Sequence, residues 1–168
     1  MVEHDLGVID EIVARGHPNI KASHRTTLEI TKDAWLTPRG DCIIAVSSNK
    51  SASDLNPQLK KALKDGLWLV FIISALKINE YDYLVARGSP SLLFTDSRSL
   101  VIRKSSYIDG RTIAINSNKA AKDIHLKIRE YLKSPDATIR VLLIATNSPD
   151  AVLAKLEDFI RKGGPGGT

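Results

Sequence analysis

The chain has 168 residues, of which 43% are hydrophobic and 26% charged, and its formal net charge is +5 at pH 7. This composition excludes a disordered chain, and no apolar run approaches the ~20 residues of a membrane span, so we expect a globular domain with no membrane partner. The single cysteine, Cys42, excludes an internal disulfide, and the segment after Met1 lacks the pattern of an export signal, so both features favour a cytoplasmic location.

The first half of the chain predicts three strands, a short helix and a further strand. In the second strand Leu28 and Ile30 alternate with polar residues, which predicts that these two side chains face the core. Asn56 is a candidate N-cap, Pro57 suits the first position of the helix, and Gly66 lies past its end. The four strands are expected at residues 5–13, 26–31, 42–46 and 67–75.

The second half predicts the same order of elements, followed by a tail. Its strands are expected at residues 78–85, 99–103, 112–116 and 138–145. Apolar residues spaced three or four apart predict one helix face that carries Ala121, Ile124, Ile128 and Leu132. Ser148 and Pro149 then predict the start of a C-terminal helix over 148–162, and the glycine-rich segment 163–168 is expected to be flexible.

The two halves also repeat each other in sequence. Eight of twenty residues are identical between 13–32 and 85–104, and seven of twenty between 46–65 and 115–134. This self-similarity predicts an internal duplication within a single domain, 1–168, whose repeats span about 5–76 and 77–146.

Each predicted repeat has the order β-β-β-α-β, which is too small to bury both faces of its strands alone. We therefore expect a mainly β (α+β) fold with one continuous core and pseudo-twofold symmetry. The expected architecture is an internally duplicated β-sandwich or distorted barrel, with one helix per half and the C-terminal helix added.

Several long polar motifs resemble the archaeal domain-of-unknown-function family 371. They are residues 14–20, 24–29 and 36–44 in the first half, with 101–105 and 110–112 in the second. The resemblance implies an archaeal cytoplasmic protein with a mainly β fold, and it supplies no activity and no catalytic residues. Residues 148–168 are expected to extend beyond the family core.

The repeat allows one half to serve as a structural control for the other. Residues that are alike in both halves are expected to serve folding, and they are Arg15/Arg87, Gly16/Gly88, Pro18/Pro90, Asn49/Asn118, Lys50/Lys119 and Asp54/Asp123. Residues that differ mark positions where function could have specialised. In the alignment His17 stands opposite Ser89, His24 opposite Asp96, and Asp41 opposite Arg111, so the first half holds the candidate acid–base groups.

One hypothesis places His17, His24, Arg39 and Asp41 in a single polar cluster with catalytic potential. Histidine can act as acid or base near neutral pH, aspartate can orient it, and arginine can hold a phosphate or carboxylate. The alternative is that both histidines bond to loop backbone while Arg39 and Asp41 form a local salt bridge. The spacing matches no metal site or cofactor motif, so none is expected, and Cys42 is expected to be a core residue rather than a nucleophile.

The second half is the more basic, with a net charge of +6 over 86–134 against +4 over 14–65. Its candidate ligand-binding residues are Arg98, Arg103, Lys104 and Arg111. Tyr107 lies among them but matches Trp35 in the first half, and aromatic residues at equivalent positions are expected to fill the core.

Two further candidates are Lys50 and Lys119, each in a loop before a helix. A lysine beside a helix start could hold phosphate, although the neighbouring Ser and Asn residues also fit ordinary turn and capping chemistry.

The charge and these patches favour binding of RNA or another polyanion, with steep salt dependence and loss of binding in Arg103→Ala or Arg111→Ala. Two alternatives stay open. The first is an enzyme that acts on a phosphorylated or nucleotide-like small molecule at the histidine cluster. The second is a protein-interaction module.

Overall fold

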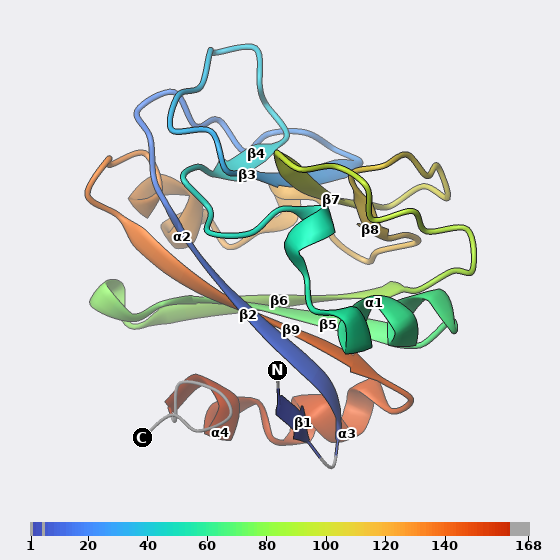
Figure 1. The fold of residues 1–168 in the computed structure, drawn as a ribbon. Helices are drawn as coiled ribbons and strands as arrows, with labels where there is room; N and C mark the ends of the chain where they lie inside the picture. Colours follow the sequence, from blue (N-terminus) through green and yellow to red (C-terminus); the bar gives the residue numbers. More distant parts are fainter. Residues whose placement is uncertain (1, 5, 162–168) are drawn as a thin grey trace.

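Two β-sheets packed face to face form the protein in the computed structural model, which describes residues 2–4 and 6–161. Figure 1 shows the two layers, with the four-stranded sheet above the five-stranded one. The prediction of a mainly β α+β fold is therefore confirmed, but the distorted barrel is wrong because neither sheet closes on itself. The predicted tail 163–168 lies outside the described residues.

The five-stranded sheet is antiparallel throughout and has the order β1-β2-β9-β5-β6. Its strands are β1 (Val2–His4), β2 (Gly7–Arg15), β9 (Thr138–Thr146), β5 (Trp68–Ala75) and β6 (Glu80–Arg87).

The four-stranded sheet has the order β4-β3-β7-β8 and mixes two kinds of pairing. Its central strands, β3 (Thr27–Thr31) and β7 (Ser99–Arg103), are antiparallel. The edge strands β4 (Ile43–Ala45) and β8 (Thr112–Ala114) each run parallel to the neighbouring central strand. Each parallel pair needs a connection that crosses the sheet, and these connections shape the candidate site.

The helices are short: η1 (Ala52–Asp54), α1 (Pro57–Lys64), η2 (Leu76–Ile78), η3 (Ala121–Asp123), α2 (Leu126–Tyr131), α3 (Pro149–Ala154) and α4 (Leu156–Arg161). The Asn56 cap is confirmed, since its Oδ1 accepts a hydrogen bond from Leu59 N at 2.8 Å. Within the described residues, no helix is long and apolar enough to cross a bilayer.

Two helix predictions need correction. The apolar face that begins at Ala121 is divided between η3 and α2, because Ile124 has an extended backbone between them. The C-terminal helix is likewise broken at Lys155, whose φ of −110° and ψ of 19° leave the helical region, so α3 and α4 are separate helices.

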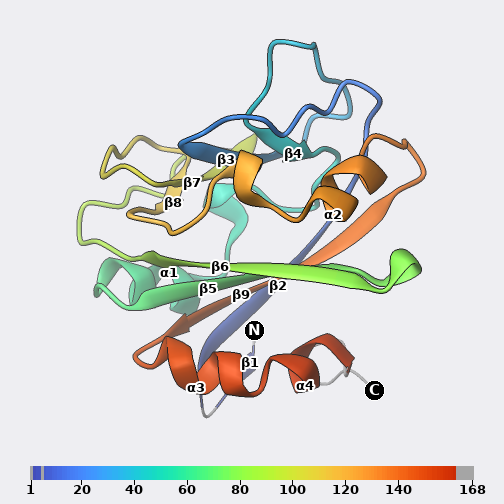
Figure 2. The same ribbon diagram turned by 180° about the vertical axis from the view of Figure 1, so that it is seen from behind.

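The main core lies between the two sheets, as the alternation of Leu28 and Ile30 predicts, and both side chains are fully buried. A second apolar cluster covers the other face of the five-stranded sheet, where Val152, Leu156 and Phe159 pack on β5 and β9 residues. Figure 2 shows α3 and α4 below that sheet, on the side away from the four-stranded sheet.

The order of elements occurs twice, first from β2 to β5 and then from β6 to β9. Corresponding central strands pair with each other and run antiparallel, β3 with β7 and β5 with β9, as a twofold axis requires. Loop contacts also correspond: Asn49 Oδ1 accepts from Val13 N at 3.0 Å, and Asn118 Oδ1 accepts from Val85 N at 2.9 Å.

Gly16 and Gly88 have matching close packing. A Cβ atom at Gly16 would lie 2.2 Å from the Ser134 carbonyl oxygen, and one at Gly88 would lie 2.1 Å from that of Leu63. The prediction that these matched glycines serve folding therefore has a steric basis, because only a residue without Cβ fits so near another backbone segment.

Candidate functional site

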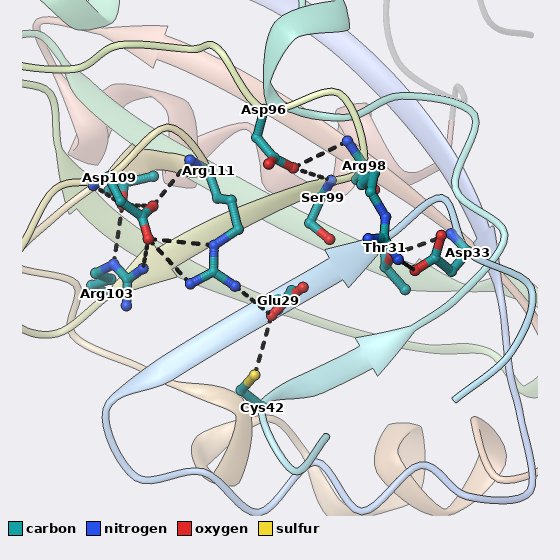
Figure 3. Close-up of polar contacts among 11 residues, drawn as sticks. Glu29, Thr31, Asp33, Cys42, Asp96, Arg98, Ser99, Arg103, Asp109 and Arg111 are labelled. Carbon is teal, nitrogen blue, oxygen red and sulfur yellow. Dashed lines mark hydrogen bonds and ion pairs between the residues drawn. The ribbon is translucent and has the colours of Figure 1, made fainter. Parts of the chain in front are cut away.

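The outer face of the four-stranded sheet carries a group of interacting polar side chains (Figure 3). Residues alternate along β3 and β7, so that Leu28, Ile30, Leu100 and Ile102 enter the core. The residues between them face outward, and they include Glu29, Thr31, Ser99 and Arg103. All four are nevertheless buried, because the connections from β3 to β4 and from β7 to β8 cross this face.

Glu29 lies at the middle of this face, opposite Val101 on β7. Its Oε1 accepts a hydrogen bond from Cys42 Sγ at 3.3 Å and lies 3.4 Å from Arg111 Nη1. Burial and the nearby Glu29 carboxylate raise the pKa of Cys42 to about 12. The thiol therefore stays protonated at neutral pH and is not an activated nucleophile. The prediction that Cys42 is a core residue is wrong, because its side chain is only partly buried and donates to Glu29 on the outer face of the sheet.

Asp109 joins two of the predicted ligand-binding arginines. Its Oδ2 lies 3.0 Å from Arg103 Nη2 and 3.1 Å from Arg111 Nη2. Partial burial alone would raise the pKa of Asp109, but hydrogen bonds from Arg111 and the charges of both arginines outweigh it, and the pKa is lowered. Arg103 is also buried and donates from Nε to Thr112 Oγ1 at 3.0 Å, so it acts as part of the folded framework.

A cleft of about 280 Å³ opens beside this network. Its lining includes the two arginines Arg98 and Arg111, together with Asp33 and Trp35. Arg98 Nη2 donates to Asp33 Oδ2 at 2.6 Å, but the side chain is 66% exposed, so most of its donors remain accessible. The cleft therefore offers both hydrogen-bond donors and carboxylate acceptors.

Two aromatic side chains lie exposed above this face, and the prediction that they fill the core is wrong. Trp35, in the connection after β3, and Tyr107, in the connection after β7, are each 62% exposed. The Arg103 guanidinium lies 4.9 Å from the centroid of the Tyr107 ring and supports it from the sheet. Matching positions in the two halves thus present a planar ring to solvent.

The histidines hold loop backbone. His17 Nδ1 accepts from Asn19 N at 3.0 Å, and His24 Nδ1 accepts from Thr26 N at 3.2 Å and from Thr27 N at 3.1 Å. Their counterparts do the same: Ser89 Oγ accepts from Ser91 N, and Asp96 Oδ2 accepts from Arg98 N and Ser99 N. This agrees with the alternative that the sequence left open, in which both histidines bond to loop backbone.

The four residues of the predicted catalytic cluster are not brought together by their side chains. Within the described part of the chain, no hydrogen bond or ion pair joins the side chains of His17, His24, Arg39 and Asp41. Arg39 is exposed, and Asp41 contacts His24 through backbone alone, with its carbonyl accepting from His24 N at 3.1 Å. The local salt bridge expected between Arg39 and Asp41 is also absent from this described part.

The backbone corrects one pairing of the sequence alignment. Asp41 O accepts from Ser23 and His24 N, while Gly110 O accepts from Thr95 and Asp96 N, so Asp41 corresponds to Gly110. By the same criterion Cys42 corresponds to Arg111, since their carbonyls accept from Glu29 N and Val101 N. The alignment had slipped by one residue in a loop of unequal length.

The three predicted lysines are all ion-paired. Lys50 Nζ lies 2.5 Å from Asp10 Oδ1, and Lys119 Nζ lies 2.5 Å from Asp82 Oδ1. Lys104 Nζ lies 2.7 Å from Asp123 Oδ2. The Lys50 and Lys119 pairs are equivalent in the two halves, which favours the turn and capping interpretation over a phosphate site.

Sequence reasoning missed Glu29, Asp33 and Asp109, the carboxylates that hold the basic residues. Glu29 carried a usable signal, because the alternation of β3 places it on the face opposite Leu28. Among the residues that the structure describes, no group of three or more His, Cys, Asp or Glu could hold a metal ion.

Comparison with known proteins identifies the family. The model of the family described as "Domain of unknown function (DUF371)" matches residues 12–146. The chain belongs to the DUF371 family. Uncharacterized protein MJ0206 of Methanocaldococcus jannaschii is 39% identical to it over 133 residues, which cover 79% of this chain and 97% of the relative. The DUF371 match ends at the last residue of β9, so α3 and α4 lie beyond it, as the sequence predicts.

Proposed function

We propose that this DUF371 protein binds single-stranded RNA on the outer face of its four-stranded sheet. The observation that carries this proposal is the matched pair of exposed rings, Trp35 and Tyr107, on the two connections that cross that face. Exposed aromatic side chains over a sheet are a common means of stacking unpaired bases, and every base has a face that can stack.

The cleft beside Trp35 supports recognition of base edges. Arg98 and Arg111 present donors there, and Asp33 and Asp96 present acceptors, so both kinds of hydrogen-bonding group on a base can be satisfied. The carboxylates also fix the directions of the arginine donors, which lowers the entropic cost of binding.

The same ion pairs change the expected salt dependence. Arg103, Lys104 and Arg111 are each paired with a carboxylate, so they contribute little net charge toward phosphate. Arg98 is also paired, with Asp33, but its side chain is 66% exposed, so Arg98 and the exposed Arg39 are the better candidates for phosphate contacts. We therefore expect a shallow salt dependence from roughly two phosphate contacts, in place of the steep one that net charge suggested.

The site contacts support binding more than catalysis. The Cys42 thiol is protonated, and His17 and His24 are engaged with loop backbone. No observed contact specifically favours the enzyme hypothesis or the protein-interaction module. An RNA partner fits the cytoplasmic location that the single cysteine favours.

We also infer that the repeated order of elements arose by internal duplication. The matched loop hydrogen bonds of Asn49 and Asn118, together with the sequence identities, support this origin. By this duplication, one aromatic position of the ancestral repeat has become two stacking positions on one face, Trp35 and Tyr107.

The test is equilibrium binding of a fluorescent single-stranded RNA of ~20 nucleotides, using a double-stranded RNA of equal length for comparison. Trp35→Ala and Tyr107→Ala are each expected to weaken single-strand binding roughly 5- to 150-fold, since stacking on one base is worth about 1–3 kcal/mol. Both side chains are exposed, so the fold should survive.

Tyr81→Ala is the matched control, because Tyr81 is an aromatic that is 42% exposed on β6 of the other sheet. It should leave binding unchanged. Equal losses in Trp35→Ala and Tyr81→Ala, or no binding of the single strand at ~50 mM salt, where phosphate contacts are strong, would refute the proposal.

A further inference from the structure

A second cleft, of about 410 Å³, lies at one end of the five-stranded sheet, away from the face that carries Trp35 and Tyr107. Residues of β2, η2 and β9 line it, among them Arg15, Lys77, Thr138 and Arg140. The helices α3 and α4 cover the middle of this sheet face with apolar side chains. The cleft is therefore a separate site, and its argument does not depend on RNA binding.

The two halves differ in the residue that stands opposite the last arginine of the strand at this cleft. Arg87 of the second half pairs across the strands with Trp68 of the first half, whose ring centroid lies 4.0 Å from the guanidinium. The corresponding Arg15 of the first half pairs with Thr138 of the second half. A small side chain thus stands where the other half has a large ring, and Arg15 is left exposed beside open space.

The same comparison shows where positive charge has been added. Arg140 lies two residues after Thr138. The corresponding residue, two positions after Trp68, is Val70, a buried member of the apolar cluster on which α3 and α4 pack. Lys77 adds a third cation. The one carboxylate paired with these cations in the described structure is that of Glu11, whose Oε1 lies 3.7 Å from Arg140 Nε.

The wall of the cleft also has unused hydrogen-bonding groups. Among the described residues, two buried side-chain polar atoms have no hydrogen-bond partner, Ser74 Oγ and Arg140 Nε, and of these Arg140 Nε has the ion pair with Glu11. Both residues line this cleft. Buried polar atoms are nearly always satisfied in proteins, so the unpaired Ser74 hydroxyl in this wall points to a polar ligand at this place.

We propose that this cleft binds a small phosphate monoester that carries an apolar group. Three cations and one carboxylate leave a local charge of about +2, which complements a phosphate near −2 at neutral pH. Two arginines suit phosphate oxygens because the guanidinium donors are planar and fixed. The exposed Val13 and Leu76 provide an apolar surface for the rest of the ligand, and the volume suits a small metabolite.

The decisive variant is Thr138→Trp, which places opposite Arg15 the same residue that covers Arg87. Calorimetry with phenyl phosphate as the probe is expected to show binding to the wild type and a loss of roughly tenfold or more in the variant, the effect of removing one or two charge-assisted contacts. Benzyl alcohol and inorganic phosphate separate the two parts of the ligand, and each should bind more weakly than phenyl phosphate.

A second pair of variants keeps the test decisive if Thr138→Trp unfolds. Arg15→Ala should weaken phenyl phosphate binding, whereas Arg87→Ala, at the matched position with no cleft, should not. Trp35→Ala should also leave phenyl phosphate binding unchanged, which distinguishes this cleft from the proposed RNA-binding face. Equal affinity for benzyl alcohol, or equal effects of Arg15→Ala and Arg87→Ala, would overturn the proposal.

Discussion

The two halves of the chain agree closely in their loops but differ on the faces of their sheets. In the loops, Lys50 with Asp10 and Lys119 with Asp82 make the same ion pair at the same distance. On the outer face of the four-stranded sheet, the backbone instead pairs unlike residues, so that Cys42 corresponds to Arg111. Contacts present in both halves therefore identify what the fold needs, while exposed positions outside those contacts identify surfaces free to acquire ligands.

The difference also explains why a count of charges misleads. Lys50 and Lys119 contribute to the net charge of +5, yet each neutralises a buried aspartate in its own half. Among the residues that the structure describes, no carboxylate pairs with Arg15 or Lys77, the cations that line the second cleft. What matters for an anionic ligand is thus the charge left unpaired at one place, rather than the sum over the chain.

The largest expected effect comes from removing a matched buried aspartate. Asp10 Oδ2 accepts from Asn56 N at 2.9 Å and Asp82 Oδ2 accepts from His125 N at 2.8 Å, while each Oδ1 binds a lysine. Asp10→Ala and Asp82→Ala should each lower the free energy of unfolding by about 3 kcal/mol, because a buried backbone donor and a charged partner lose their acceptor.

Urea unfolding measures both variants, and Asp65→Ala is the control. Asp65 forms an exposed ion pair with Lys61, so its loss should cost about 0.5 kcal/mol or less. A large loss of unfolding free energy in only one of Asp10→Ala and Asp82→Ala would show that the two loops are not equivalent.

A smaller and pH-dependent effect is expected at Asp54 and Asp123. Hydrogen bonds from Ser51 hold the pKa of Asp54 at about 2, below its usual 3.8, and the ion pair with Lys104 lowers the pKa of Asp123. A depressed folded-state pKa stabilises the protein above the unfolded pKa, and this contribution is lost as the pH falls through the folded value. For Asp54 the loss therefore occurs between about pH 4 and pH 2.

Unfolding at a series of pH values tests this in Asp54→Asn and Asp123→Asn. The stability lost by the wild type between pH 4.5 and pH 2 should shrink by about 1 kcal/mol in Asp54→Asn, a value reduced because the side chain is partly exposed. Asp123→Asn should change the curve in the same direction. Superimposable pH curves for wild type and variants would contradict the assignment.

Much of the fold could be predicted because its signals are local. Alternation placed Leu28 and Ile30 in the core, and Asn56 with Pro57 identified the start of α1. The break at Lys155 carries no such signal, since neither glycine nor proline marks it. The sheet order also depends on long-range pairing, so a sandwich and a barrel could not be separated from the strand pattern alone.

The candidate site was harder to predict because its contacts join distant residues. Arg111 reaches Glu29, which is 82 positions away, and this pairing depends on how β3, β7 and β8 lie in the sheet. The sequence predicts that Trp35 and Tyr107 fill the core because they are aromatic residues at equivalent positions of the two halves. Their exposure follows from the connections that lift them above a face already filled by smaller polar residues.

The smallest expected effect comes from exchanging a histidine for its counterpart. His24→Asp installs the residue that performs the same backbone capping at Asp96, so the free energy of unfolding should change by less than about 0.5 kcal/mol. His24→Ala, which removes the acceptor for Thr26 and Thr27, should cost about 1 kcal/mol by comparison with other lost caps. Because aspartate preserves the cap but not the imidazole, His24→Asp should also retain full RNA binding. A stable His24→Asp protein that loses RNA binding would show that this histidine serves the ligand as well as the loop.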